Sequence, residues 1–193
     1  EDPKNVFNFG APGLDHLSHV RWMSLKQLEK RLDMKLAKPI FLVSYHPVTL
    51  ETNSVFAMKQ LLLALDEFPD ASIVITYPNA DTQGREIINV IESYIKRNRG
   101  RVKAFSSLGQ QCYLSLMKEC DVVIGNSSSG LTEAPALKKV TVNIGTRQRG
   151  RLKASSILDC EESFNAIKES IRIALSAKMQ ERGCTTNSLY GNS

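Results

Sequence analysis

Residues 121–151 read DVVIGNSSSGLTEAPALKKVTVNIGTRQRGR. A short apolar run at residues 122–124 stops at a glycine, and a second, β-branched run at residues 140–144 stops at another. Between them lie a hydroxyl-rich turn and a short helical pattern at residues 131–137. This order predicts strand, turn, helix, strand and loop. It indicates a parallel βαβ unit whose polar residues fall at strand ends and at a helix N-terminus.

The polar residues of this unit are typical of a phosphate site. In open α/β sheets the ligand binds beyond the carboxyl ends of the strands. A helix N-terminus offers free N–H groups and the positive end of a dipole. The hydroxyls of Ser127 and Ser128 and the guanidinium of Arg147 supply further donors. We therefore expect this stretch to bind a phosphate compound.

The rest of the chain repeats the same alternation of strands and helices. Apolar runs predict further strands at 6–9, 40–45, 71–76, 102–105 and 156–158. Helical patterns fall at 15–36, 54–65, 84–96, 112–117 and 161–179. With no internal repeat, this predicts an α/β fold with a doubly wound parallel, Rossmann-like sheet. We expect a boundary segment and connecting helix at 1–36, the Rossmann-like domain at 37–180 and a polar tail at 181–193, with mobility beginning near residue 176.

Composition narrows the class of protein. The 193 residues are 42% hydrophobic and 23% charged, which is ordinary for a soluble globular chain. The net charge of +5 suits an anionic ligand, but no basic stripe interleaved with aromatics indicates nucleic acid. No apolar run reaches the length of a membrane span, and the acidic start is no signal peptide. The four cysteines show no metal or disulfide spacing, so we expect buried free thiols and a cytoplasmic location.

Several polar residues follow the predicted strands directly. His46 follows the strand at 40–45, Asn79 follows the strand at 71–76, and Arg147 follows the strand at 140–144. Because parallel strands end at the same edge of a sheet, these residues and the two serines can converge. The chain has neither a GxGxxG pattern after its first strand nor a GxxxxGK[ST] loop, which argues against a dehydrogenase and a P-loop kinase.

Two of the candidates have a structural alternative. Glu133 could complete a capping box with Ser129 or Gly130, or it could accept hydrogen bonds from a ribose diol. His46 could be a packed core imidazole, or it could lie at the sheet edge and contact a phosphate or act as an acid.

Four ordered motifs resemble those of one enzyme family. They are His46 to Thr49, Tyr77 to Asp81, Gly125 to Gly130 with Glu133, and Asn143 to Arg151. Over essentially its whole length the chain is similar to the hydrolysing UDP-N-acetylglucosamine 2-epimerases of sialic-acid biosynthesis. Non-hydrolysing relatives carry an arginine-rich run after the corresponding histidine, so Pro47-Val48-Thr49 favours the hydrolysing branch.

The resemblance implies a role for each site residue. Family members have two Rossmann-like domains in the GT-B arrangement, and this chain resembles the C-terminal, UDP-binding half. By that resemblance Ser127 and Ser128 bind the diphosphate, Glu133 binds the ribose, and Arg147 binds the UDP or its sugar. His46 and Asn79 also line the site, and His46 lies near the reacting sugar as a candidate catalytic residue.

The implied reaction is anti-elimination of UDP through a 2-acetamidoglucal, followed by hydration to N-acetylmannosamine. It needs no metal or redox cofactor. The implied partners are UDP-GlcNAc or a related UDP-HexNAc and the N-terminal half of the same enzyme, which would carry the proton-transferring carboxylates. We expect this half alone to bind and not to turn over, and the full-length enzyme to be a homo-oligomer.

Three alternatives stay open. A related enzyme acts on UDP-diacetylbacillosamine in legionaminic-acid synthesis, and no residue here separates the two sugars. A glycosyltransferase of the same two-domain architecture would use a similar UDP site but transfer the sugar to an acceptor. The chain could also be a nucleotide-binding module without activity of its own.

Overall fold

The computed structural model describes residues 2–5, 7, 10–47, 54–78 and 82–191. Six parallel strands form one sheet in the order β3-β2-β1-β4-β5-β6. They are β1 (Ile40–Ser44), β2 (Ser72–Thr76), β3 (Val102–Phe105), β4 (Val122–Gly125), β5 (Val140–Ile144) and β6 (Ile157–Cys160). The helices are η1 (Pro3–Asn5), η2 (Pro12–His19), α1 (Leu25–Leu32), α2 (Ser54–Asp66), α3 (Thr82–Arg97), α4 (Gln110–Glu119), η3 (Ser128–Gly130), α5 (Glu133–Ala136), α6 (Phe164–Leu175) and α7 (Ala177–Thr185). The doubly wound parallel sheet predicted from the sequence is confirmed.

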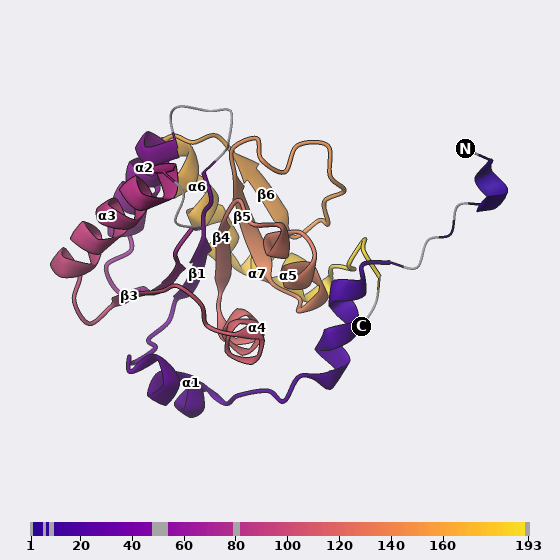
Figure 1. Ribbon diagram of the computed structural model, residues 1–193, viewed down its shortest axis with the longest axis horizontal. Helices are drawn as coiled ribbons and strands as arrows, with labels where there is room; N and C mark the ends of the chain where they lie inside the picture. The colour runs from indigo at the N-terminus through magenta and orange to yellow at the C-terminus, as the bar shows by residue number, and fades with distance from the viewer. Residues whose placement is uncertain (1, 6, 8–9, 48–53, 79–81, 192–193) are drawn as a thin grey trace.

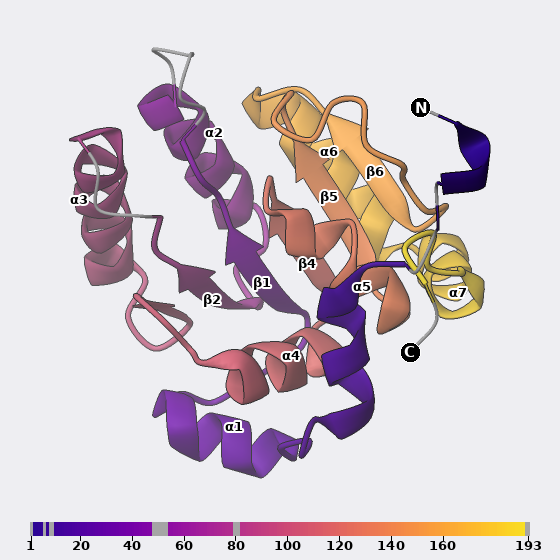
Figure 2. The ribbon, with the colours of Figure 1, turned by 45° about the vertical axis from the view of Figure 1, so that its right-hand side comes forward.

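Helices cover both faces of the sheet (Figures 1 and 2). Phe41 and Val43 of β1 pack into a cluster with α2, α3 and α6, whereas Ile40 and Leu42 pack into a cluster with α1 and α4. Because successive strand residues point to opposite faces, a strand covered on both sides is apolar throughout, and β1 is buried along its whole length. The sheet therefore exposes its strand ends rather than its faces.

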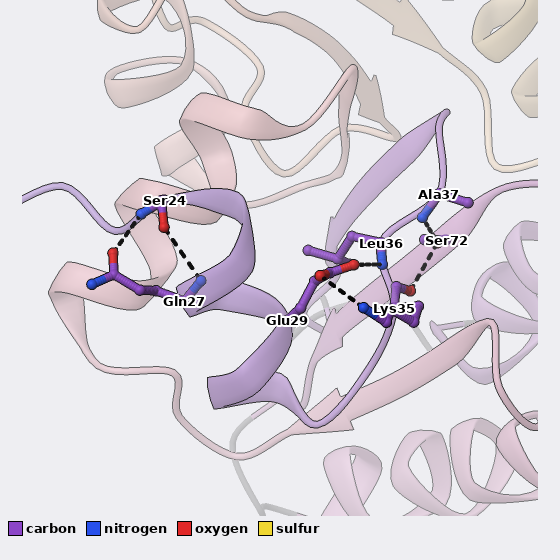
Figure 3. Close-up of polar contacts among 7 residues, drawn as sticks. All are labelled: Ser24, Gln27, Glu29, Lys35, Leu36, Ala37 and Ser72. Atoms are coloured by element: carbon purple, nitrogen blue, oxygen red, sulfur yellow. Dashed lines mark hydrogen bonds and ion pairs between the residues drawn. The ribbon is translucent and has the colours of Figure 1, made fainter.

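The predicted helix at 15–36 is wrong in its continuity. The structure has the 3-10 helix η2, then extended backbone at Val20, and then α1. Ser24 starts α1 with a capping box: its hydroxyl accepts from Gln27 N at 3.4 Å, and the Gln27 side chain accepts from Ser24 N at 2.8 Å (Figure 3). Asp33, in the left-handed conformation, ends the helix. Periodic leucines do not reveal these local stops.

The segment after α1 is tied to the sheet by polar contacts (Figure 3). The carboxylate of Glu29 accepts a hydrogen bond from Leu36 N at 3.1 Å, and the hydroxyl of Ser72 at the start of β2 accepts one from Ala37 N at 2.8 Å. These bonds satisfy backbone donors in the connection that leads into β1. They fix where the first strand begins.

The C-terminal tail expected from residue 176 onward is also corrected. Ser176 ends α6 in an extended conformation, and its hydroxyl then caps α7 by accepting from Met179 N at 3.3 Å. Met179 is buried, and a Cβ added at Gly183 would lie 2.9 Å from Val140 Cγ2. The polar composition therefore concealed a helix that packs closely on the sheet.

None of the helices in the described part of the chain is both long and apolar enough to cross a membrane. The predicted strand at 6–9 falls largely outside the described residues.

The four cysteines have free thiols but differ in exposure. Cys112 and Cys120 are buried as expected, whereas Cys184 on α7 is exposed, so that part of the expectation is wrong. Burial raises the pKa of Cys120 to about 12 and the pKa of Cys160 to about 11. At pH 8 these two thiols carry almost no thiolate, the reactive form.

We expect iodoacetamide at pH 8 to alkylate Cys184 in the native chain and to spare Cys120. All four cysteines should react after unfolding. Peptide mass spectrometry reads each site, and rapid labelling of Cys120 in the native chain would contradict its burial.

Candidate functional site

The candidate site lies at the carboxyl ends of β1 and β4, which are neighbours in the sheet although far apart in sequence. Strand order reverses here, since β2 and β3 lie on one side and β5 and β6 on the other. Such a switch point leaves a crevice where open α/β proteins bind ligands. A cavity of about 390 Å³ opens at this edge, and its lining includes Ser44, His46, Thr76, Tyr113, Ser127 and Ser129.

Gly125 allows the backbones of β1 and β4 to approach closely at this point. A Cβ added to Gly125 would lie 2.1 Å from the Ser44 carbonyl oxygen, and the residue has φ of +136°. Both facts require glycine. The close approach brings the turn at Asn126 and Ser127 against the end of β1.

A chain of hydroxyls crosses the floor of the cavity. Ser44 Oγ lies 2.7 Å from Thr76 Oγ1 and 3.4 Å from Tyr113 Oη. Tyr113 Oη lies 2.7 Å from Ser129 Oγ, which donates to Ser127 Oγ at 3.0 Å. Hydroxyls can reverse their bonds, so this network can present either donors or lone pairs to a ligand.

Sequence reasoning did not identify three members of this network. Ser44 and Thr76 are polar residues that end apolar strands, and they are direct partners in the β1–β2 register. A polar residue at the end of an apolar strand is the sequence feature that could have identified Ser44 and Thr76. Tyr113 lies on α4 within an ordinary helical pattern, so nothing local marked it.

His46 lies at the sheet edge, partly buried, and lines the cavity. Its backbone N–H donates to Asn126 Oδ1 at 2.8 Å. Burial, with a contribution from the nearby Arg147 charge, lowers the pKa of the imidazole below its ordinary value. Because His46 is only partly buried and lines the cavity, its imidazole is not a fully packed core group.

Arg147 reaches back from the loop after β5 toward the turn after β4. Its Nη1 donates to the Asn126 carbonyl oxygen at 2.9 Å, and the buried Gln148 side chain donates to the same oxygen at 2.7 Å. All three arginines of the loop, Arg147, Arg149 and Arg151, are exposed. What distinguishes Arg147 is its bond to the Asn126 carbonyl, which holds it beside the cavity although it is not part of the cavity lining.

Glu133 is the first residue of α5 and is partly exposed. Its carboxylate accepts a hydrogen bond from Thr132 Oγ1. The capping-box alternative does not occur, because Ser129 N donates to Ser127 Oγ at 3.4 Å and Gly130 N donates to Ser127 O at 3.2 Å. Ser128 is exposed beside this turn. Asn79, the remaining candidate, lies outside the described residues.

The Glu162 carboxylate packs against the start of the loop that carries Arg147. Tyr45, fully buried, donates from its hydroxyl to Glu162 Oε1 at 2.7 Å. The same carboxylate oxygen would lie 2.6 Å from a Cβ added to Gly145, the first loop residue, which has φ of +73°. Glu162 therefore connects the ends of β1, β5 and β6 beneath the site.

Two further features bear on the kind of site. Among the residues that the structure describes, no cluster of histidine, cysteine and acidic side chains could hold a metal ion. A second cavity of about 460 Å³ lies between α2 and α3, with Leu62, Tyr94 and Arg97 in its lining. It is larger than the cavity at the strand ends, but it lies between two helices rather than at the carboxyl ends of the strands, where open α/β proteins bind ligands.

Comparison with known proteins supports one family. The family model described as UDP-N-acetylglucosamine 2-epimerase matches residues 1–193. The chain is 43% identical over 162 residues to the GDP/UDP-N,N'-diacetylbacillosamine 2-epimerase (hydrolyzing) of Campylobacter jejuni, which covers 83% of this chain and 42% of that protein. It is 35% identical over 180 residues to the polysialic acid biosynthesis protein P7 of Escherichia coli, covering 92% of this chain and 45% of that protein.

Among solved structures, the fold is similar to that of S. aureus MnaA in its co-structure with UDP. The TM-score is 0.74 at 14% identity, over 100% of this chain and 51% of that chain. This likeness concerns the fold alone. The chain spans less than half the length of the curated relatives described above. From the match along its whole length, the chain belongs to the UDP-N-acetylglucosamine 2-epimerase family.

Proposed function

We propose that this chain is the UDP-binding half of a hydrolysing 2-epimerase that acts on a UDP-linked 2-acetamido sugar. The observation that carries the proposal is the cavity at the β1–β4 crevice, lined by His46 and the Ser127 and Ser129 hydroxyls, next to a turn whose Asn126 carbonyl binds Arg147. Neutral donors and one fixed guanidinium suit a diphosphate. Because the chain spans less than half of its relatives, the rest of the active site would come from the other half.

The proposed reaction proceeds in two steps. A base removes the C2 proton while the C1–O bond to UDP breaks on the opposite face of the sugar, which forms the C1=C2 double bond of a 2-acetamidoglucal. Water then adds across this bond, with hydroxyl at C1 and a proton at C2 from the other face. With UDP-GlcNAc as substrate, the products are UDP and N-acetylmannosamine.

The contribution of this chain is to stabilise the leaving group. Ser127 and Ser128 would bind the diphosphate, Arg147 the phosphate or sugar, and Glu133 the ribose diol, with Asn79 completing the edge. Donors that are oriented before the bond breaks need no reorganisation as negative charge develops on the leaving oxygen. The carboxylates that move protons at C2 would belong to the other half, so this chain alone should bind UDP without turnover.

The substrate sugar is tested on the intact enzyme with UDP-GlcNAc and UDP-diacetylbacillosamine in parallel. We expect one of them to give UDP together with the free 2-epimeric sugar, identified by NMR. Release of UDP without a 2-epimer from either substrate would contradict the proposal. Release that requires an added sugar acceptor would instead indicate a glycosyltransferase.

His46 should affect both turnover and stability. In the proposed complex the His46 imidazole contacts the diphosphate and the reacting sugar. The variant His46→Gln should therefore lower turnover of the intact enzyme by roughly two orders of magnitude. The pKa of His46 is lower in the folded chain than its value of about 6.5 in the unfolded chain. The contribution of neutral His46 to the free energy of unfolding is therefore complete above a pH of about 6.5, and it is lost as pH falls through the folded pKa.

Urea denaturation of the chain between pH 7.5 and pH 5 measures this effect. His46→Gln should flatten the acid side of the profile, whereas the control His19→Gln, at an exposed position, should leave it unchanged. Unchanged turnover and an unchanged pH profile in His46→Gln would show that the imidazole has no role here.

A further inference from the structure

Asn126 occupies an unusual position directly after β4. It is 1% exposed, and its backbone N–H donates to the Ser44 carbonyl at 3.1 Å. Its side-chain carboxamide then makes two bonds to the backbone of a single residue, His46. Asn126 Oδ1 accepts from His46 N at 2.8 Å, and Asn126 Nδ2 donates to His46 O at 2.8 Å.

This pairing extends the sheet beyond its last backbone pair. The β1–β4 register ends at Ser44 and Gly125. A carboxamide carries one acceptor and donors in the same plane, as a peptide group does, so the Asn126 side chain serves as a substitute strand for His46. Aspartate would lack the donor, alanine would lack both groups, and glutamine would be one methylene too long.

The main-chain carbonyl of the same residue binds the other side of the site. It accepts from Arg147 Nη1 at 2.9 Å and from Gln148 Nε2 at 2.7 Å. Gln148 is itself 2% exposed, so its amide is held by packing. One residue on β4's end therefore contacts both the imidazole-bearing backbone after β1 and the guanidinium after β5.

We propose that Asn126 is the positioning residue of this site, which holds His46 through its side chain and Arg147 through its carbonyl at a fixed separation. The proposal deepens the proposed function, since it rests on a diphosphate as the ligand that the two groups contact. Asn126 acts through these neighbours and is not itself a catalytic residue.

The test uses the full chain with ¹⁵N-labelled histidine. The variants are Asn126→Ala, the uncharged Asn126→Gln and a matched control, Asn143→Ala. Asn143 is another buried asparagine of the same sheet, in register with Gly125, and its amide donates to Asp159 at 2.7 Å. NMR follows the titration of the His46 imidazole, and calorimetry measures UDP affinity.

We expect Asn126→Ala to move the His46 titration upward toward its ordinary value, because the imidazole is no longer held in its buried position. UDP affinity should fall roughly tenfold, the effect of losing about one well-placed hydrogen bond. Asn143→Ala should lower the melting temperature without either change. If Asn126→Ala does not fold, Asn126→Gln, which displaces the same amide by one methylene and adds no charge, should show the same upward movement.

The outcomes separate the two proposals. Wild-type binding of UDP with an unchanged His46 titration and unchanged affinity in the folded Asn126 variant would overturn the positioning role and leave the proposed function standing. No UDP binding by the wild-type chain or the intact enzyme, with a moved His46 titration in the variant, would overturn the proposed function and leave the positioning role standing.

Discussion

Gly125→Ala is expected to remove most of the chain's stability. The added methyl would lie 2.1 Å from the Ser44 carbonyl oxygen and 2.6 Å from its carbonyl carbon, which are backbone atoms of the neighbouring central strand. No side-chain rotation can relieve that contact, so β1 and β4 must separate. A single substitution that lowers the free energy of unfolding by more than about 4 kcal/mol is exceptional, and overpacking of the core is one of the causes. The whole free energy of unfolding of a typical domain is about 5–15 kcal/mol.

The control for this variant is Gly100→Ala. Gly100 also has a positive φ, +93°, but a Cβ there would meet nothing within 4 Å. It should lose about 1 kcal/mol from backbone strain alone. Urea denaturation followed by circular dichroism compares the two. If Gly125→Ala were no less stable than Gly100→Ala, the close approach of β1 and β4 would be wrong.

Arg147→Ala should produce the largest loss of UDP affinity among the loop arginines. Its guanidinium is anchored by the Asn126 carbonyl at 2.9 Å, so a phosphate contact would cost little side-chain ordering. A hydrogen bond between charged groups contributes about 1.5–3 kcal/mol, which corresponds to a loss of roughly 10- to 100-fold. Calorimetric titration with UDP measures it.

Arg149→Ala is the matched control, since it removes the same charge two residues away. Both arginines are exposed, and the bond to the Asn126 carbonyl belongs to Arg147. It should weaken UDP binding by less than about threefold, as expected for a screened surface charge. Ser128→Ala should lie between the two variants. Equal losses in Arg147→Ala and Arg149→Ala would mean that the loop acts only through diffuse positive charge.

The strand pattern of the chain is strong enough to predict the sheet. Runs such as Ile40 to Ser44 and Val140 to Ile144 are buried on both faces, which leaves an unbroken apolar signal. The polar residues just beyond them, His46, Ser127 and Arg147, could be predicted as a group because parallel strands end at one edge. Their convergence follows from topology.

The features that were not predicted depend on contacts between residues far apart in the sequence, or on single residues that end a helix. Tyr113 enters the hydroxyl network only because α4 packs across the ends of β1 and η3. Ser176 separates two helices. Its N–H donates to the Ile173 carbonyl at the end of α6, and its hydroxyl accepts from Met179 N at the start of α7, which the hydrophobic periodicity does not reveal. Asn126 was visible as part of a motif, but its pairing with His46 spans 80 positions.

UDP binding at the β1–β4 crevice is tested most directly by amide chemical-shift mapping of the ¹⁵N-labelled chain during titration with UDP. The cavity at the strand ends, with the bond between Arg147 and the Asn126 carbonyl beside it, predicts that the shifted amides will be those of His46, Tyr113, Asn126 to Ser129 and Arg147. Shifts confined to the larger cavity between α2 and α3, around Lys59, Tyr94 and Arg97, would contradict the assignment of the site.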